Sequence, residues 1–140
     1  MFYLAIALTV LANVVYHVAQ RSVPRDVHPL TSLMVNYLVA LAATAALWPF
    51  FAPRAPLAAQ LRGFNWASAA VGLSIVGVEL GFLLAYRAGL NVSLASVITG
   101  SLLAVLLLPV GVFYFRERLS PLNLVGFVFC VVGVILVGRK

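Results

Sequence analysis

The sequence predicts an all-α integral membrane protein with five transmembrane helices. Of its 140 residues, 64% are hydrophobic and only 9% are charged, and the mean hydropathy is +1.14. This apolar content lies far above that of an ordinary soluble domain. Five stretches without Lys or Arg are long enough to cross a bilayer core, which needs about 20 helical residues. They cover residues 2–19, 30–51, 66–86, 92–115 and 121–138.

The connections between these stretches leave no room for a second domain. The longest one, residues 52–65 (APRAPLAAQLRGFN), is far too short to fold by itself, so we expect a single transmembrane domain over residues 1–140. Any activity must then lie within or between the helices, which excludes a soluble catalytic site, and we do not expect an enzyme. Cys130 is the only cysteine, which excludes an internal disulfide and a CxxC metal or redox motif. The sequence therefore predicts neither a metal site nor a cofactor.

The basic residues are distributed as membrane anchors and not as a nucleic-acid surface. The net charge is +6 and the isoelectric point is about 10.3, but the nine Lys and Arg residues are spread over every connection and the C-terminus. The first stretch has no charged start and no small-residue cleavage site before Gln20 and Arg21, so we interpret it as a retained helix and not as a signal peptide. We therefore expect the lipid bilayer, and not nucleic acid, as a partner.

The distribution of Lys and Arg favours neither orientation in the membrane. The amino-terminal side carries Arg54, Arg62, Arg116 and Arg118, and the other side carries Arg21, Arg25, Arg87, Arg139 and Lys140. Since the side richer in these residues normally faces the cytoplasm, a near tie predicts insertion both ways. Two oppositely inserted copies would form the inverted repeat of many transporters, so we predict an antiparallel homodimer of ten helices. The alternative is one fixed orientation, set by biogenesis factors or by a different partner chain.

Polar residues form stripes along the first two helices. Because polar side chains in lipid are stable only against protein or water, such stripes indicate the faces that look inward. At steps of three and four residues, the first helix carries Thr9, Asn13, Tyr16, His17 and Gln20. The second helix carries Ser32, Asn36, Tyr37, Ala40 and Thr44. For Asn13, His17 and Asn36 two roles remain open: lining a wet cavity that binds substrate, and structural hydrogen bonds between helices.

The last two helices combine polar and small residues. The fourth begins with Asn91, Ser93, Ser96, Thr99 and Gly100. Further along the same helix, Pro109 removes one backbone donor and favours a kink. Small residues that permit close contact between helices recur in the fifth, which carries Asn123, Gly126, Cys130 and Gly133.

The third helix holds the one acidic residue within the five stretches, Glu79 in GVELGFLLAY. In this segment Gly77, Gly81 and Ala85 recur every four residues and make a face that another helix can approach closely. Glu79 is two residues from Gly77, about 200° around the helix, so it points away from that face. It shares its own side of the helix with Phe82, Leu83 and Tyr86.

A carboxylate near the middle of a membrane indicates a function, because it costs on the order of 2 to 3 kcal/mol unless it is protonated, paired or hydrated. We expect Glu79 to alternate between a proton and a cationic substrate, with the rings of Phe82 and Tyr86 as cation-binding faces. The alternative is a structural Glu79 that pairs with an arginine or a polar side chain of another helix. Arg87 lies about two turns along the same helix, too far for such a pair.

The C-terminal stretch, residues 85–140, resembles the end of an EamA-type repeat of the drug/metabolite transporter superfamily. The resemblance lies in AYRAGLNVSLAS, in the loop FRERLSPLNLVGF and in GVILV. Glu117 and Leu119 match the Glu-x-Leu of the family, and Gly126 matches its following glycine. Five helices in this length also resemble one repeat. Full-length relatives have two inverted repeats in one chain, and the related four-helix small multidrug resistance proteins work as antiparallel dimers.

The sequence also departs from the pattern that this resemblance implies. Ala12 and Asn13 stand where many repeats have a Trp-Gly pair, and Asn36 stands about where many have an arginine. The first helix has no acidic residue, so Glu79 would have to replace the essential glutamate of the small multidrug resistance proteins from another helix. Glu117 matches the family motif but lies in a loop, where we expect it to serve loop structure or capping.

We therefore predict a transporter of the bacterial inner membrane that works by alternating access and exports small metabolites or drugs, with proton coupling through Glu79. The alternatives are a facilitator or lipid-linked-sugar flippase, and a non-transporting subunit of a larger membrane complex. The residues predicted to bind the small-molecule substrate are Asn13, His17, Asn36, Tyr37, Glu79, Phe82, Tyr86, Ser96 and Thr99.

Overall fold

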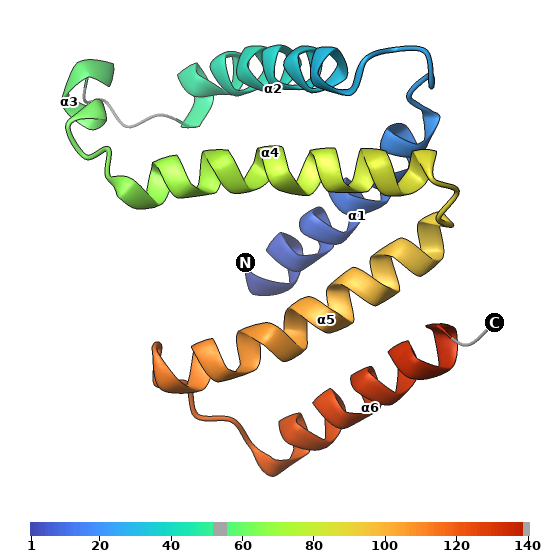
Figure 1. The fold of residues 1–140 in the computed structure, drawn as a ribbon. Helices are drawn as coiled ribbons and strands as arrows, with labels where there is room; N and C mark the ends of the chain where they lie inside the picture. The colour runs from blue at the N-terminus through green and yellow to red at the C-terminus, as the bar shows by residue number, and fades with distance from the viewer. Residues whose placement is uncertain (52–55, 139–140) are drawn as a thin grey trace. The chain divides into compact units, whose positions relative to one another are not determined.

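The computed structural model describes residues 1–51 and 56–138, and all regular structure in this part of the chain is helical. The helices are α1 (Phe2–Ser22), α2 (Pro29–Phe51), α3 (Leu57–Leu61), α4 (Trp66–Arg87), α5 (Val92–Phe113) and α6 (Pro121–Gly138) (Figure 1). The chain forms two compact units, Met1–Ala88 with α1 to α4 and Gly89–Lys140 with α5 and α6. The prediction of an all-α membrane protein is confirmed.

Four of the five predicted spans are confirmed within the described residues. The helices α1, α2, α4 and α5 are long and apolar enough to cross a membrane, whereas the fifth apolar segment, Pro121–Val137, is shorter. The short helix α3 was not predicted and lies in the long connection, 52–65. Arg54, Arg139 and Lys140, which entered the comparison of charges, lie outside the described residues.

Two helices have ends that differ from the prediction for local reasons. The first runs to Ser22 instead of residue 19, because Gln20 and Arg21 both donate hydrogen bonds to backbone carbonyls of α4. The helix α5 stops at Phe113, two residues early, because the amide of Phe115 bonds back to the carbonyl of Val110 at 3.2 Å and tightens the last turn.

In the first unit, α4 is the helix against which both α1 and α2 pack. It begins at Asn65, whose side-chain oxygen accepts from the amides of Ala67 and Ser68 at 3.0 and 3.3 Å. In Figure 1, α2 runs alongside α4 and α1 crosses it near its C-terminal end. The buried side chains of this unit gather around that crossing and the start of α2: His17, Gln20, Ser32, Leu33, Leu83 and Tyr86.

In the second unit, α5 and α6 pack against each other as a helical hairpin. The connection turns through Arg116, whose φ of 54° lies in the left-handed region, and the amide of Glu117 bonds to the carbonyl of Gly111 at 2.9 Å. The Glu117 carboxylate then lies over Gly111, where an added Cβ would come within 2.5 Å of its Oε2. This contact agrees with the expected role of Glu117 in loop structure.

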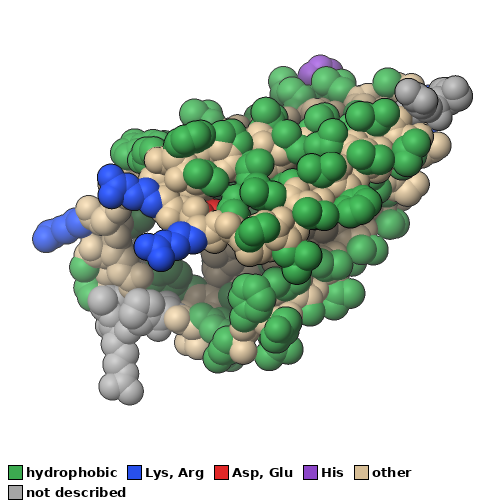
Figure 2. Space-filling view, turned by 90° about the horizontal axis from the view of Figure 1, so that it is seen from below, with side chains coloured by type: hydrophobic (Ala, Val, Ile, Leu, Met, Phe, Trp, Pro, Cys, Tyr) green, Lys and Arg blue, Asp and Glu red, His purple; other side chains and the backbone are tan. Residues whose placement is uncertain are grey.

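Most apolar side chains on the long helices are exposed in this single chain. Figure 2 shows hydrophobic side chains over most of the visible face. Soluble proteins rarely expose contiguous apolar patches of that kind, and such patches mark contact with lipid or with other protein. The glycines Gly77, Gly81, Gly126 and Gly133, which we expected at close helix contacts, have no atom within 4 Å of an added Cβ in the described part of the chain.

Candidate functional site

Glu79 lies half-buried on the side of α4 that faces α1 and α2. Its Oε2 accepts a hydrogen bond from Nδ2 of Asn36, on α2, at 3.1 Å. Among the described residues its carboxylate forms no ion pair. Arg87 instead donates to the carbonyls of Pro24 and Val27, in the connection between α1 and α2. Arg87 therefore forms no ion pair with Glu79 in the described part of the chain, which agrees with their separation along the helix.

Gln20 fixes the position of α1 beside this acid. Its Nε2 donates to the backbone carbonyl of Glu79 at 2.9 Å, and the side chain is only 4% exposed. Loss of this hydrogen bond would leave a buried amide without a partner, at a cost of about 1 to 3 kcal/mol in stability. The bond therefore holds α1 in register with the turn of α4 that carries the carboxylate.

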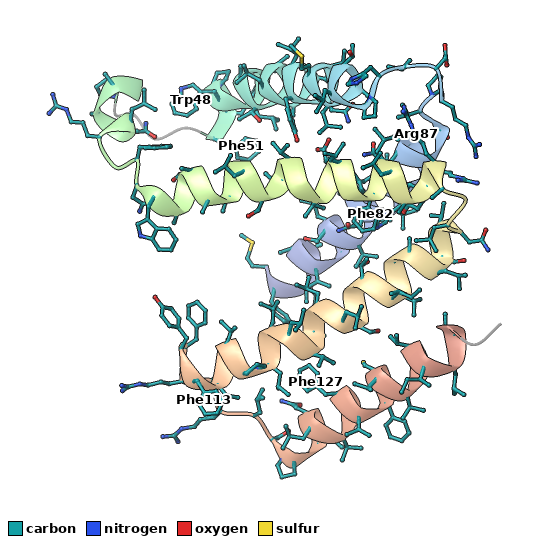
Figure 3. All side chains as sticks on the ribbon, viewed as in Figure 1. Trp48, Phe51, Phe82, Arg87, Phe113 and Phe127 are labelled. Atoms are coloured by element: carbon teal, nitrogen blue, oxygen red, sulfur yellow. The ribbon has the colours of Figure 1, made fainter. Side chains whose placement is uncertain are left out.

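An aromatic cluster lies beside Glu79, where α1 crosses α4. The ring of Phe82 meets that of His17 edge to face at a centroid distance of 4.7 Å, and stacks on that of Tyr86 at 5.9 Å. Tyr16 approaches Phe82 edge to face at 6.1 Å. Tyr86 and His17 are buried and joined by a hydrogen bond of 2.8 Å between the hydroxyl and Nδ1. Figure 3 shows Phe82 among the side chains at this crossing.

Two tyrosine hydroxyls near the acid are buried without a hydrogen-bond partner in the described part of the chain. They belong to Tyr16 on α1 and Tyr37 on α2, and both lie close enough to Glu79 to interact with its charge. Since buried polar atoms are nearly always hydrogen-bonded, these two hydroxyls are available to bond a further polar group.

The structure brings six of the nine predicted substrate-binding residues together around the face of α4 that meets α1 and α2. They are His17, Asn36, Tyr37, Glu79, Phe82 and Tyr86. Asn13 is not among them: it is exposed, and its Nδ2 donates to the carbonyl of Thr9 in its own helix at 3.0 Å.

Ser96 and Thr99 belong to the second unit and bond within their own helix. Ser96 Oγ donates to the carbonyl of Ser93 at 3.1 Å, and Thr99 Oγ1 donates to that of Ala95 at 2.7 Å. Such back-bonding to the preceding turn satisfies a hydroxyl in an apolar helix without any partner helix. Their role in binding substrate stays a prediction.

Two residues beside Glu79, Tyr16 and Gln20, were in the predicted stripe of the first helix but not among the predicted site residues. Tyr16 supplies an edge-on ring and a hydroxyl without a partner, and Gln20 holds the backbone of Glu79. The signal that could have identified them was their spacing in this stripe: Tyr16 is three residues from Asn13, and Gln20 is three residues from His17.

The chemistry available here is that of cation binding. One carboxylate, several aromatic faces and two free hydroxyls can hold an ammonium-like group by charge, by ring quadrupoles and by hydrogen bonds. The described residues contain no group of three or more His, Cys, Asp or Glu side chains suited to a metal ion. We name this group of Tyr16, His17, Asn36, Tyr37, Glu79, Phe82 and Tyr86 the Glu79 cluster.

Comparison with known proteins places the chain in a family of membrane proteins. The model of the EamA-like transporter family matches residues 1–139. No curated protein and no solved structure gives a significant match to the chain. The family match extends over both units, including the half of the chain in which the sequence showed no motif resemblance.

Proposed function

This chain belongs to the EamA-like transporter family, and from that premise we propose that it exports a small cationic or amphipathic metabolite or drug by exchange at Glu79. Its family is one of membrane transporters of the drug/metabolite type, which agrees with its apolar helices. The proposed location is the bacterial inner membrane. The substrate and a proton would bind the same carboxylate in turn.

The observation that carries this proposal is the pairing of Glu79 with one neutral amide. Asn36 occupies one acceptor position of the carboxylate, at 3.1 Å, and leaves its charge unbalanced. An ionised acid in that state is costly within a membrane, so it favours either a proton or a cationic ligand. Because only one of them can neutralise the carboxylate at a time, the entry of the substrate would displace the proton.

We further propose that two copies assemble antiparallel and alternate access around the Glu79 cluster. The near tie of basic residues supports insertion both ways. The open glycine face of α4 supports close approach by a second copy, since neither Gly77 nor Gly81 has an atom within 4 Å of an added Cβ. Two inverted copies would supply the pseudo-two-fold symmetry that alternating access uses in other transporters.

The transport proposal is tested with purified protein in sealed vesicles, loaded with a lipophilic phosphonium cation as the substrate probe. A proton gradient should drive movement of the cation through the unaltered protein. Glu79→Gln keeps the size and the hydrogen-bonding of the side chain but removes its charge and its titration, so gradient-driven movement should vanish. Thr9→Val, which changes an exposed polar residue of α1 that is not among the predicted substrate-binding residues, serves as the control and should keep the activity. Full coupled transport by Glu79→Gln would refute proton exchange at this residue.

The orientation proposal is tested by adding two arginines to the connection 52–65. They should lock one orientation, and cells holding only that form should lose transport. Separately expressed copies locked in the opposite sense should restore it when they are combined. Activity in cells that hold a single locked form would contradict the antiparallel dimer.

A facilitator or lipid-linked-sugar flippase is a second candidate, favoured by the same hydrogen bond. In it, Glu79 and Asn36 would orient a hydroxyl or amine of the substrate while the acid never cycles its proton. The unpartnered hydroxyls of Tyr16 and Tyr37 would suit a polyhydroxyl substrate. Transport that ignores the proton gradient but still requires Glu79 would support this candidate.

A third candidate is a non-transporting subunit of a larger membrane complex, which the extensive exposed apolar surface would also suit. Purification separates it from the other two. A chain that always copurifies with a different membrane protein, and never as a self-dimer, would support the subunit.

A further inference from the structure

A second candidate site lies in the same unit, apart from the Glu79 carboxylate, at the C-terminal ends of α1 and α4. A cavity of about 200 Å³ forms where the C-terminal ends of α1 and α4 meet the connection to α2. Three of the residues that line this cavity are arginines: Arg21, Arg25 and Arg87. No acidic residue is among the lining residues. Figure 3 shows Arg87 at this end of α4.

The structural hydrogen bonds of these arginines leave most of their donors unused. Arg21 donates one hydrogen bond, from Nη1, to the backbone carbonyl of Tyr86 on α4. Arg87 Nη2 donates to the carbonyls of Pro24 and Val27, at 3.2 and 2.6 Å, while its Nε is buried without a partner in the described chain. Arg25 is exposed and forms no hydrogen bond or ion pair with any described residue. Each guanidinium has five N–H donors, so most of the donors of these three arginines form no hydrogen bond with a described residue.

The positive charge here exceeds what the helix ends require. The C-terminus of a helix carries about half a negative charge, so the ends of α1 and α4 together account for about one of the three arginine charges. Asp26 is next to Arg25 in the sequence but forms no ion pair with a described residue. A net positive charge therefore remains at the cavity, which favours an anionic ligand such as a phosphate group.

We propose that this cavity binds a phosphate group, either of a small soluble phosphate or of an anionic phospholipid headgroup. A guanidinium group can bind two phosphate oxygens at once through two parallel N–H groups. In this cavity three arginines are available for such binding, and no carboxylate lines the cavity to compete for them. The helices whose ends form it, α1 and α4, are long and apolar enough to cross a membrane, so their ends are expected near the interface, where headgroups are found. Because Arg21 and Arg25 are exposed, a ligand can reach the cavity from outside the unit.

The test is a binding titration on the full chain in phosphatidylcholine nanodiscs, followed by calorimetry. Inorganic phosphate and a short-chain phosphatidylglycerol are the two probes. Arg25→Gln removes one charge without breaking any structural hydrogen bond, so the protein should fold normally. Arg62→Gln is the matched control, since Arg62 is an exposed arginine of the same unit that does not line the cavity.

Arg25→Gln should weaken binding of the preferred probe about tenfold or more, and Arg62→Gln should leave it unchanged. Binding of inorganic phosphate alone would assign a soluble ligand, binding of phosphatidylglycerol alone would assign a headgroup, and binding of both would assign a shared phosphate site. The proposal is overturned if the unaltered protein binds neither probe. It is also overturned if Arg25→Gln and Arg62→Gln change the affinity equally, since the bound anion would then lie elsewhere.

Discussion

Asn36 on α2 donates to the carboxylate of Glu79 on α4 at 3.1 Å, and no positively charged side chain shares this contact in the described part of the chain. The amide orients the acid without neutralising it. The same hydrogen bond ties α2 to α4, so any movement between these two helices changes the environment of the carboxylate. Binding at Glu79 and the relative movement of helices would in this way be coupled.

Replacement of Asn36 by leucine should impair transport. The substitution keeps a similar volume but removes the donor, so Glu79 loses its one hydrogen bond from another side chain in the described chain. The loss of a hydrogen bond to a charged group corresponds to a change in substrate affinity of about tenfold or more. The affinity for the phosphonium probe, measured by calorimetry, should fall accordingly, while the control Thr9→Val should have no effect. Equal affinities in both variants would show that Asn36 has no part in binding.

Replacement of Tyr86 by phenylalanine should destabilise the first unit by about 1 to 3 kcal/mol, because His17 Nδ1 then stays buried without its 2.8 Å partner. Thermal unfolding in detergent would measure the change. Tyr3→Phe is the control, because Tyr3 is 84% exposed and its hydroxyl has no such partner. If the two variants unfold at the same temperature, the bond between α1 and α4 does not contribute to stability.

Replacement of Gly77 by isoleucine should weaken self-association. Nothing lies within 4 Å of an added Cβ at this position, so the single chain accepts the larger side chain, whereas a helix of a second copy packed there would be pushed away. Cross-linking in membranes should show fewer dimers. Gly72→Ile provides the control, since Gly72 is equally open but lies on another side of α4. Unchanged dimer content in Gly77→Ile would place the dimer contact elsewhere.

Replacement of Gly111 by alanine should disturb the turn between α5 and α6. The new Cβ would come within 2.5 Å of Glu117 Oε2, and the carboxylate would have to move off the helix. The variant should be less stable, by about 1 kcal/mol, than Gly100→Ala in the same helix, where the new methyl group meets no atom within 4 Å. Thermal unfolding of both variants gives the comparison. Adding Glu117→Ala to Gly111→Ala should remove the difference if the contact is its cause.

Helix boundaries and the inward face of α4 could be predicted from the sequence because both depend on local patterns. Apolar length placed the helices within three residues of their ends. Spacing placed Glu79 on one side with Phe82 and Tyr86; in the structure Phe82 and Tyr86 contact His17 on α1, and the Glu79 carboxylate bonds to Asn36 on α2. A membrane strengthens such patterns, since a polar group on the lipid side has no water to bond.

The partners of individual side chains could not be predicted in the same way. Asn13 and His17 belong to one stripe, yet His17 is buried against Tyr86 and Asn13 bonds to its own helix. The difference arises because α1 crosses α4 (Figure 1), and the side-chain contacts of α1 with α4 come from residues 16–21, in the C-terminal part of α1. A crossing angle depends on side-chain packing between two helices, which no periodicity within one helix reports.

Proton exchange at Glu79 is tested by counting the protons that are released when the purified protein binds the phosphonium cation. The measurement uses a weakly buffered solution that contains a pH-sensitive dye. Binding should release protons from the unaltered protein, and Glu79→Gln should release none. Proton release of the same size from Glu79→Gln, or tight binding by the unaltered protein without any release, would contradict exchange at Glu79.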